Sequence, residues 1–393
     1  MSEHKSNPRP EYEPGVFTGG AKIGWNLGNA FDCFGKDGIA LETAWGNPLV
    51  KRELIQAVAR AGFDIVRMPV TWLGHIGDRE SGYAIDREWL ERIDEVAGWI
   101  RDAGMKAVIN IHHDGADEGH WLSVKRAAAD SAVRKETGEM FSSVWTHIAR
   151  HFAHEGDWLL FEGMNEIHDG GWGWGGNRTD GGLQYEIVNE WNRLFVEAVR
   201  ASGGANATRW LVLAGYVTNH DLTIEHLVIP HDSANRLVVT AHYYTPQDFC
   251  ISAKVPHWGK SGTQKTWVND KGETVSTEYG QEETVLKDLD RIAEAFVQKG
   301  IPVYLGECGA TSQSPEGRDY RRYWMEFVTT ACRERGIVPV YWDNGYGGEG
   351  HEQFGLFDRG ATLPLPYPHA EPILEAMMRG AKTGQGTEDI RLP

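Results

Sequence analysis

Short runs of apolar residues recur eight times along the chain, and more polar segments separate them. Most of the runs are nearly continuous, a pattern typical of parallel strands that are buried on both faces. The predicted strands are residues 21–28, 63–70, 105–112, 158–164, 209–216, 236–244, 301–307 and 337–344. The hydrophobic pattern therefore predicts eight buried strands.

The segments between most of these runs carry apolar residues at helical spacing. In residues 86–104, for example, Trp89, Ile93, Val96 and Ile100 fall on one face. Several of the segments end in Gly, a usual C-terminal stop for a helix. The clearest predicted helices are residues 48–62, 86–104, 185–203 and 283–300.

Eight strands that alternate with helices predict the α/β class, as a single (β/α)8 TIM barrel with elongated loops at its C-terminal face. The alternative is an open doubly wound sheet, but the sequence has no Gly-rich phosphate turn of the right form after an early strand. We expect residues 1–20 to be a flexible N-terminal arm, residues 21–380 to be one domain, and residues 381–393 to be a C-terminal tail.

The amino-acid composition limits the classes of molecule that the protein is expected to bind. The formal net charge of -17 disfavours a polyanionic partner such as nucleic acid. Among the 16 Trp residues, Trp172 and Trp174 lie in a Gly-rich polar stretch, 170–177, where a core residue is not expected. We expect them to line a binding cleft, whereas Trp145 and Trp324 have the periodic surroundings of core residues.

The cysteines and the N-terminal segment say little about function, but they bear on disulfides, metal sites and location. Cys33, Cys250, Cys308 and Cys332 are scattered, which argues against a structural zinc site or a disulfide scaffold and leaves open whether any pair is bridged. No apolar run reaches the roughly 18 residues of a membrane-spanning helix. The polar start without an apolar core is compatible with a cytoplasmic location or with a signal peptide that has been removed.

Polar side chains stand at the carboxyl ends of most predicted strands, where a closed barrel carries its active site. The second run ends near Arg67 and the third at His112 and His113. The remaining candidates are Asn165 and Glu166 on the fourth run, His242 and Tyr244 on the sixth, Glu307 on the seventh, and Trp342 on the eighth.

Glu166 and Glu307 form the pair that matters most for chemistry. Two carboxylates on either side of one bond are the arrangement for glycoside hydrolysis, at about 5–5.5 Å in retaining enzymes and about 6.5–9.5 Å in inverting ones. One carboxyl must stay protonated while the other stays ionised. We expect a raised pKa for Glu166, and an ionised Glu307 held by Arg67 and by the Tyr244 hydroxyl.

These residues lie in motifs that resemble glycoside hydrolase family 5, in the clan whose acid and nucleophile end strands four and seven. The matching stretches are GWNLGN, ETAWGNP, GFDIVRMPVTW, VINIHHD, FEGMNEI, AHYYTP, VYLGECG and VYWDNG, in order from residue 24 to 345. ETAWGNP and YWDNG look most like subfamily 4. The resemblance implies an endo-β-1,4-glucanase, with activity on xyloglucan or mixed-linkage glucan common among members.

The resemblance also implies roles, residue by residue. Glu166 is the implied acid/base, Glu307 the nucleophile, and Asn165 the partner of the sugar 2-hydroxyl. The other implied site residues are Arg67 and Tyr244 beside Glu307, His112 and His242 in the pocket, Trp342 as the sugar platform, and Asn26, Trp45 and His113 near the glycone side. The family usually has Pro after the acid/base, where this chain has Ile167. The local turn and the aglycone contacts are therefore expected to differ.

Rival interpretations remain. A metal hydrolase would use His112, His113, His242 and Glu307, but the first run lacks the usual His-x-His and offers Asn26 and Asn29. A non-catalytic carbohydrate-binding barrel would not need a matched acid and nucleophile. An endo-β-1,4-mannanase of the same family is the nearest alternative substrate class.

The prediction is thus a retaining endo-glucanase that cleaves β-1,4-glucan backbones by double displacement. It needs no cofactor and no metal, and its partner is a β-linked plant polysaccharide, with no nucleic acid or membrane involved. This activity favours a secreted or periplasmic location. The preferred glucan and the oligomeric state stay open.

Overall fold

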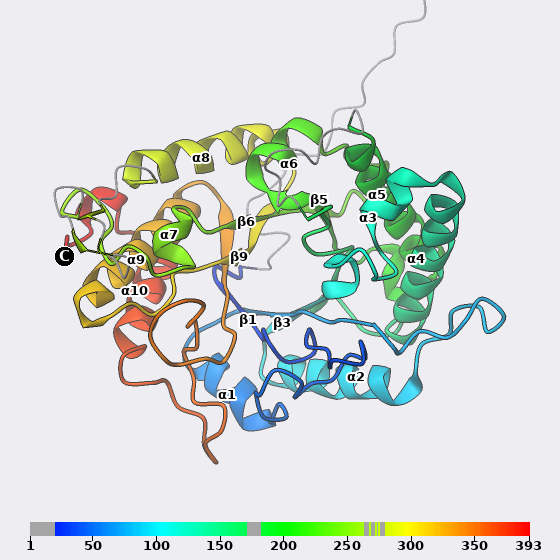
Figure 1. Cartoon of the computed structure of the whole chain (residues 1–393), viewed down its shortest axis with the longest axis horizontal. Coiled ribbons are helices and arrows are strands. Elements are labelled where there is room, and N and C mark those ends of the chain that lie inside the picture. The colour runs from blue at the N-terminus through cyan, green and yellow to red at the C-terminus, as the bar shows by residue number, and fades with distance from the viewer. Residues whose placement is uncertain (1–19, 171–181, 263–266, 269–271, 273, 276–279) are drawn as a thin grey trace, which may run out of the picture.

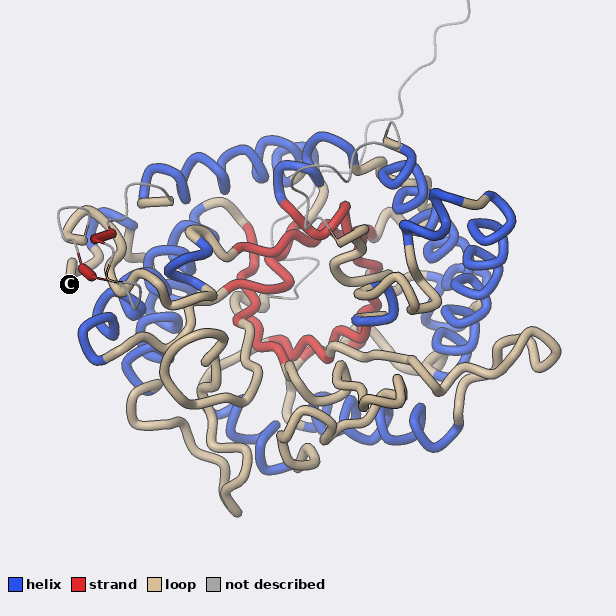
Figure 2. The backbone as a smooth tube through the Cα atoms, viewed as in Figure 1, coloured by secondary structure: helices blue, strands red, loops and turns tan. Residues whose placement is uncertain are grey.

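The computed structural model describes residues 20–170, 182–262, 267–268, 272, 274–275 and 280–393. Eight parallel strands close into a barrel in the order β1-β10-β9-β6-β5-β4-β3-β2, seen end-on as a ring in Figure 2. The strands are β1 (Gly24–Asn26), β2 (Ile65–Met68), β3 (Lys106–Asn110), β4 (Leu159–Glu162), β5 (Leu211–Asn219), β6 (Leu237–Tyr243), β9 (Val303–Cys308) and β10 (Ile337–Tyr341). The predicted TIM barrel is confirmed, because each strand overlaps one of the eight predicted runs.

Helices surround the ring (Figure 1). The α-helices are α1 (Arg52–Arg60), α2 (Arg87–Asp102), α3 (Val124–Ala129), α4 (Ser131–His151), α5 (Leu183–Ala201), α6 (His220–His226), α7 (Gln247–Cys250), α8 (Glu282–Ala295), α9 (Arg318–Glu334) and α10 (Glu371–Lys382). The four helices predicted most clearly correspond to α1, α2, α5 and α8. A short antiparallel pair, β7 (Trp267–Val268) and β8 (Thr274–Val275), stands outside the barrel and was not predicted.

The barrel interior is built in tiers. Nearly every strand contributes a side chain to an apolar floor inside the barrel. These side chains contact one another and form a cluster separate from the larger core beneath the helices. Its strand members are Ile65, Val108, Leu160, Val212, Val238, Tyr304, Val338 and Val340. Side chains two residues apart on a strand share a face, so the next inward positions form a second tier. That tier is polar: Arg67, Asn110, Glu162, Thr240 and Gly306.

All four cysteines are free and buried, which answers the question of bridging. Residues after α10 lie against α9, where the Arg333 guanidinium donates to main-chain carbonyls of Thr383 and Gln385 and where Ile390 is buried. Within the described residues, every helix is too short or too polar to cross a membrane.

Candidate active site

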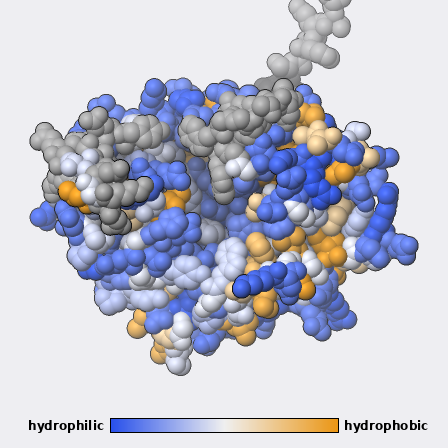
Figure 3. All heavy atoms as spheres, viewed as in Figure 1, coloured by the Kyte–Doolittle hydropathy of each residue, from blue (hydrophilic) through white to orange (hydrophobic). Residues whose placement is uncertain are grey.

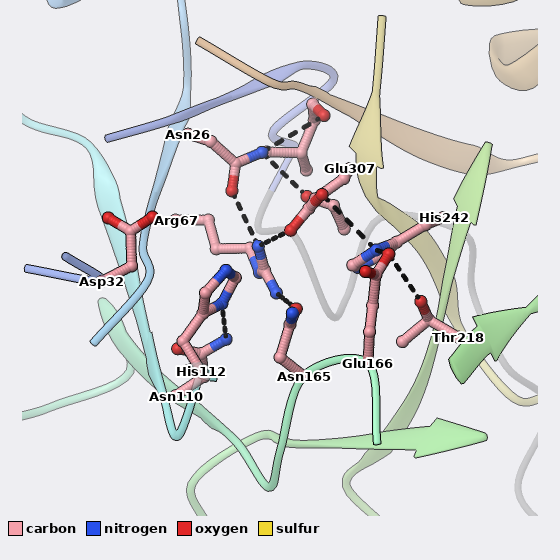
Figure 4. Close-up of polar contacts among 12 residues, drawn as sticks. Asn26, Asp32, Arg67, Asn110, His112, Asn165, Glu166, Thr218, His242 and Glu307 are labelled. Atoms are coloured by element: carbon pink, nitrogen blue, oxygen red, sulfur yellow. Dashed lines mark hydrogen bonds and ion pairs between the residues drawn. The ribbon is translucent and has the colours of Figure 1, made fainter. Parts of the chain in front are cut away.

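Glu307 lies at the end of β9 and is held from two sides. Arg67 donates from Nη1 to Oε1 at 2.9 Å (Figure 4), and the Tyr244 hydroxyl donates to Oε2 at 2.9 Å. The residue is 6% exposed. Burial raises the pKa of Glu307 above its usual range, while His242 and Arg67 act to lower it. The two predicted partners of Glu307 are therefore in place.

Arg67 is the hub of the site because its guanidinium reaches four groups. It donates to Glu162 Oε2 from Nε at 2.6 Å and to Asn165 Oδ1 from Nη2 at 2.7 Å. Nη1 is shared between Glu307 and Asn26 Oδ1, the latter at 2.9 Å. The side chain is fully buried, so its charge is met by protein groups alone. A planar donor fork of this kind fixes the relative positions of its acceptors.

Glu166 follows β4 and faces Glu307 across His242. His242 Nδ1 lies 2.6 Å from Glu166 Oε1 and 3.5 Å from Glu307 Oε2. One oxygen of each carboxylate lies within 4.8 Å of the other. Burial raises the pKa of Glu166 to about 7, against lowering contributions from His168, Arg67 and Thr218. Burial also lowers the pKa of His242 to about 4, so the imidazole is neutral near pH 7.

The backbone is bent beside Glu166. Val217 and Thr218 both have φ 51°, a left-handed conformation that is costly for β-branched residues. The pairing of β5 with β6 shifts register in the same region, between Ala214 and Asn219. Val217 N donates to Ile167 O at 3.0 Å, and the Thr218 hydroxyl comes within 3.4 Å of Glu166 Oε1. The strained turn thus brings a hydroxyl to Glu166 and fastens the segment in which Ile167 replaces Pro.

Aromatic rings line the site on one side. The ring of Trp342, which follows β10, stacks on the ring of His112. The ring centroids are 6.0 Å apart and the ring planes differ by 6°. A side chain at Gly28 would come within 2.7 Å of the Trp342 ring, so Gly is required there. His113 packs against His112 at 4.3 Å and against Trp45 at 5.4 Å. Figure 3 shows this face of the molecule hollowed over the barrel, with mostly hydrophilic residues beside the hollow.

Asn26 has a different placement from the one that the sequence predicts. Asn26 is fully buried inside the barrel, where Oδ1 accepts from Arg67 and Nδ2 donates to Gly306 O at 2.9 Å and to Tyr341 O at 3.2 Å. These contacts place it under the cleft as a support for Arg67, away from direct contact with a sugar. Trp172 and Trp174 lie outside the described residues.

Metal-binding capacity is divided between two groups in the described chain. Asp32, His112 and His113 form one set of ligand atoms within 4.8 Å, and Glu166, His242 and Glu307 form the other. The four ligands of the metal-hydrolase alternative are therefore split between two sets. The Glu166 set coincides with the carboxylate pair, and its members are hydrogen-bonded to one another, to Arg67 and to Tyr244.

Sequence reasoning missed several residues that shape the site. Glu162 and Asn110 hold Arg67 and His112 from below, and Thr218 reaches Glu166. A signal existed for Glu162: alternation from Leu160 places it on the inner face of its strand, where an unpaired carboxylate would be costly. The sequence carried no comparable signal for Thr218, because its position depends on the left-handed turn.

Comparisons with known proteins agree on one family. The family described as Cellulase (glycosyl hydrolase family 5) matches residues 28–348. Endoglucanase A of Paenibacillus barcinonensis is 33% identical over 379 residues, covering 91% of this chain and 87% of that protein.

Solved structures are also similar over nearly the whole chain. A broad-specificity endoglucanase of family 5, subfamily 4, from Bacteroides salanitronis is 41% identical with a TM-score of 0.87, covering 98% of this chain and 100% of that one. A Bacteroidetes-affiliated family 5 cellulase linked with a polysaccharide utilization locus is 39% identical with a TM-score of 0.89, covering 96% of each chain.

Proposed function

The chain belongs to the cellulase family, glycosyl hydrolase family 5, and we propose that Glu307 is its nucleophile and Glu166 its acid/base. The activity is endo-hydrolysis of β-1,4-glucan with retention at the anomeric carbon. The observation that carries the residue assignment is the approach of the two carboxylates within 4.8 Å. So close an approach suits a retaining pair, whose carboxyl groups lie about 5–5.5 Å apart.

In the first step, Glu307 forms an ester bond to the anomeric carbon while the glycosidic oxygen leaves with the proton of Glu166. Arg67 and Tyr244 hold the two oxygens of Glu307, so its attacking orientation exists before substrate arrives. A pKa of about 7 leaves Glu166 protonated below neutral pH, as the acid role requires.

In the second step, Glu166 has lost its proton and acts as base. It takes a proton from water, which attacks the anomeric carbon and releases Glu307 as a carboxylate. His242 at 2.6 Å suits both stages, because a neutral imidazole either accepts from a protonated carboxyl or donates to an ionised one.

The substrate is a β-linked glucan, and we assign it more finely to plant cell-wall polymers, including mixed-linkage glucan and xyloglucan. Support comes from the broad-specificity relative in subfamily 4 and from the open, polar face over the barrel. Such a polymer cannot enter a cell intact, so we also assign the enzyme to a secreted or periplasmic location.

The residue roles are tested by leaving-group dependence. Glu166→Gln should lose roughly 10²–10⁴-fold activity on glucan but little on aryl cellobiosides whose phenol leaves without protonation. Glu307→Gln should lose at least about 10⁴-fold on both while still binding oligosaccharide. Proton NMR of the first wild-type product should show the β-anomer.

Three outcomes would contradict the proposal. An α-anomer as first product would show inversion, and equal losses of Glu166→Gln on both substrates would remove its acid role. Preferential release of manno-oligosaccharides from a panel of defined polymers would move the substrate to mannan.

A further inference from the structure

Glu162, the last residue of β4, is a buried carboxylate directly beneath the two catalytic candidates. It is fully buried and stands in the polar tier, two residues above the floor residue Leu160. Its two carboxylate oxygens have different neighbours. Oε2 is bonded to Arg67, and Oε1 lies on the side of His242.

Oε2 of Glu162 accepts two hydrogen bonds. Arg67 Nε donates to it at 2.6 Å and Asn110 Nδ2 at 3.1 Å. The same Asn110 amide lies 3.2 Å from His112 Nδ1. The Arg67 guanidinium is thus shared between two buried carboxylates, Glu162 through Nε and Glu307 through Nη1.

Oε1 of Glu162 points toward β6 and β9. A Cβ atom at Gly306 would lie 2.5 Å from Thr240 Oγ1, 3.3 Å from His242 Nε2 and 3.5 Å from Glu162 Oε1. The Tyr304 phenol adjoins Glu162 and Thr240 as well. The absence of a side chain at Gly306 lets these polar groups gather immediately below Glu307.

We propose that Glu162 is a positioning residue that divides the charge of Arg67, so that Arg67 orients Glu307 without forming a full ion pair with it. A carboxylate bound by an uncompensated guanidinium is held as an anion and is a weaker nucleophile. The second negative charge also favours the oxocarbenium-like transition state, which carries positive charge. This inference rests on the proposed role of Glu307.

The effect of neutralising Glu162 has a defined sign. The groups around Glu307 are Arg67 from β2, His242 from β6, Tyr244 after β6, and Glu166 after β4. In Glu162→Gln the negative charge next to Arg67 disappears, so Arg67 stabilises ionised Glu307 more strongly. The pKa of Glu307 then falls, and the acid limb of its reactivity moves to lower pH.

The experiment measures the nucleophile directly. An activated 2-deoxy-2-fluoro-cellobioside transfers its glycosyl group to the nucleophile and releases its leaving group without help from the acid/base. We expect Glu162→Gln to shift the acid limb of the inactivation rate down by about one pH unit and to lower the rate at the optimum about tenfold. Glu162→Asp, which keeps the charge, should be slower with the limb where the wild type has it.

A second variant guards against a folding defect in Glu162→Gln. Tyr304→Phe removes a hydroxyl beside Glu162 but no charge, so Glu162 draws more strongly on Arg67. The acid limb should therefore move slightly upward, opposite to the shift in Glu162→Gln. Limbs that coincide with the wild type in both variants would overturn the inference.

Peptide mapping separates this inference from the proposed function. A wild-type label on a residue other than Glu307 would sink the assignment of the nucleophile. A label on Glu307 with unmoved limbs would sink only the role of Glu162.

Discussion

The floor and the polar tier of the barrel are two residues apart on the same strands, yet their side chains are stabilised in different ways. Leu160 and Glu162 on β4, or Ile65 and Arg67 on β2, point into the same interior and are equally buried. The floor residues need only apolar neighbours, and burying each contributes about 1.5–3 kcal/mol. The polar residues cost free energy on burial unless every charge meets a partner.

This difference indicates which positions affect stability alone and which affect activity as well. In the floor, side chains are interchangeable as long as volume is kept. In the polar tier, Arg67 has four acceptors at fixed angles, so shape and charge must both be kept. Substitutions in the two tiers should therefore have different signatures.

The largest effect is expected from Arg67→Lys. An ammonium cannot reproduce the fork that reaches Glu162, Asn165 and Glu307 together, so Glu307 loses its orientation and a buried pair is broken. We expect kcat/KM on glucan to fall by about 10³-fold and the free energy of unfolding by about 3 kcal/mol.

The same exchange on the surface is the control. Arg87 forms an ion pair with Glu91, but its side chain is 87% exposed. Arg87→Lys should leave both quantities unchanged, because exposed pairs contribute about 0–1 kcal/mol. Wild-type kinetics in Arg67→Lys would mean that the hub is dispensable.

An intermediate effect, on stability alone, is expected from Leu160→Ala. Truncating this floor residue leaves a cavity and should lower the free energy of unfolding by about 2–5 kcal/mol. Denaturant unfolding measures the loss, while kcat/KM well below the melting temperature should stay within about twofold of the wild type. Leu160→Met, which keeps the volume, should cost less than about 1.5 kcal/mol. A change in the pH profile of Leu160→Ala would show that the two tiers are not separable.

The smallest effect concerns the basic limb of kcat/KM. Glu166 must be protonated to act as acid and its pKa is about 7, so kcat/KM should fall as pH rises above about 7. The Thr218 hydroxyl lowers that pKa from 3.4 Å. Thr218→Val should therefore move the basic limb upward by roughly 0.3 pH units, a few tenths as expected for one long hydrogen bond. A downward shift would contradict the contact.

Much of the fold followed from pattern alone. The eight apolar runs became the eight barrel strands, because buried parallel strands must be apolar on both faces. The polar side chains at the strand ends lie together at one end of the barrel, with Tyr244 and Arg67 on Glu307 as expected. Asn26 is the exception: it lies at a strand end as the sequence predicts, but its amide turns inward to Arg67 and the strand carbonyls.

The sequence by itself determined the strand count, the order of the motifs and the chemical kinds that end each strand, because these depend on local alternation and composition. Only the tertiary structure decided which side chains share a charge. Closure of β1 against β10 and the register of β4, β6 and β9 bring Glu162, Glu307 and Glu166 around one guanidinium and one imidazole. Burial then separates their behaviour, since the desolvation and the partner of a carboxylate are properties of the packed interior.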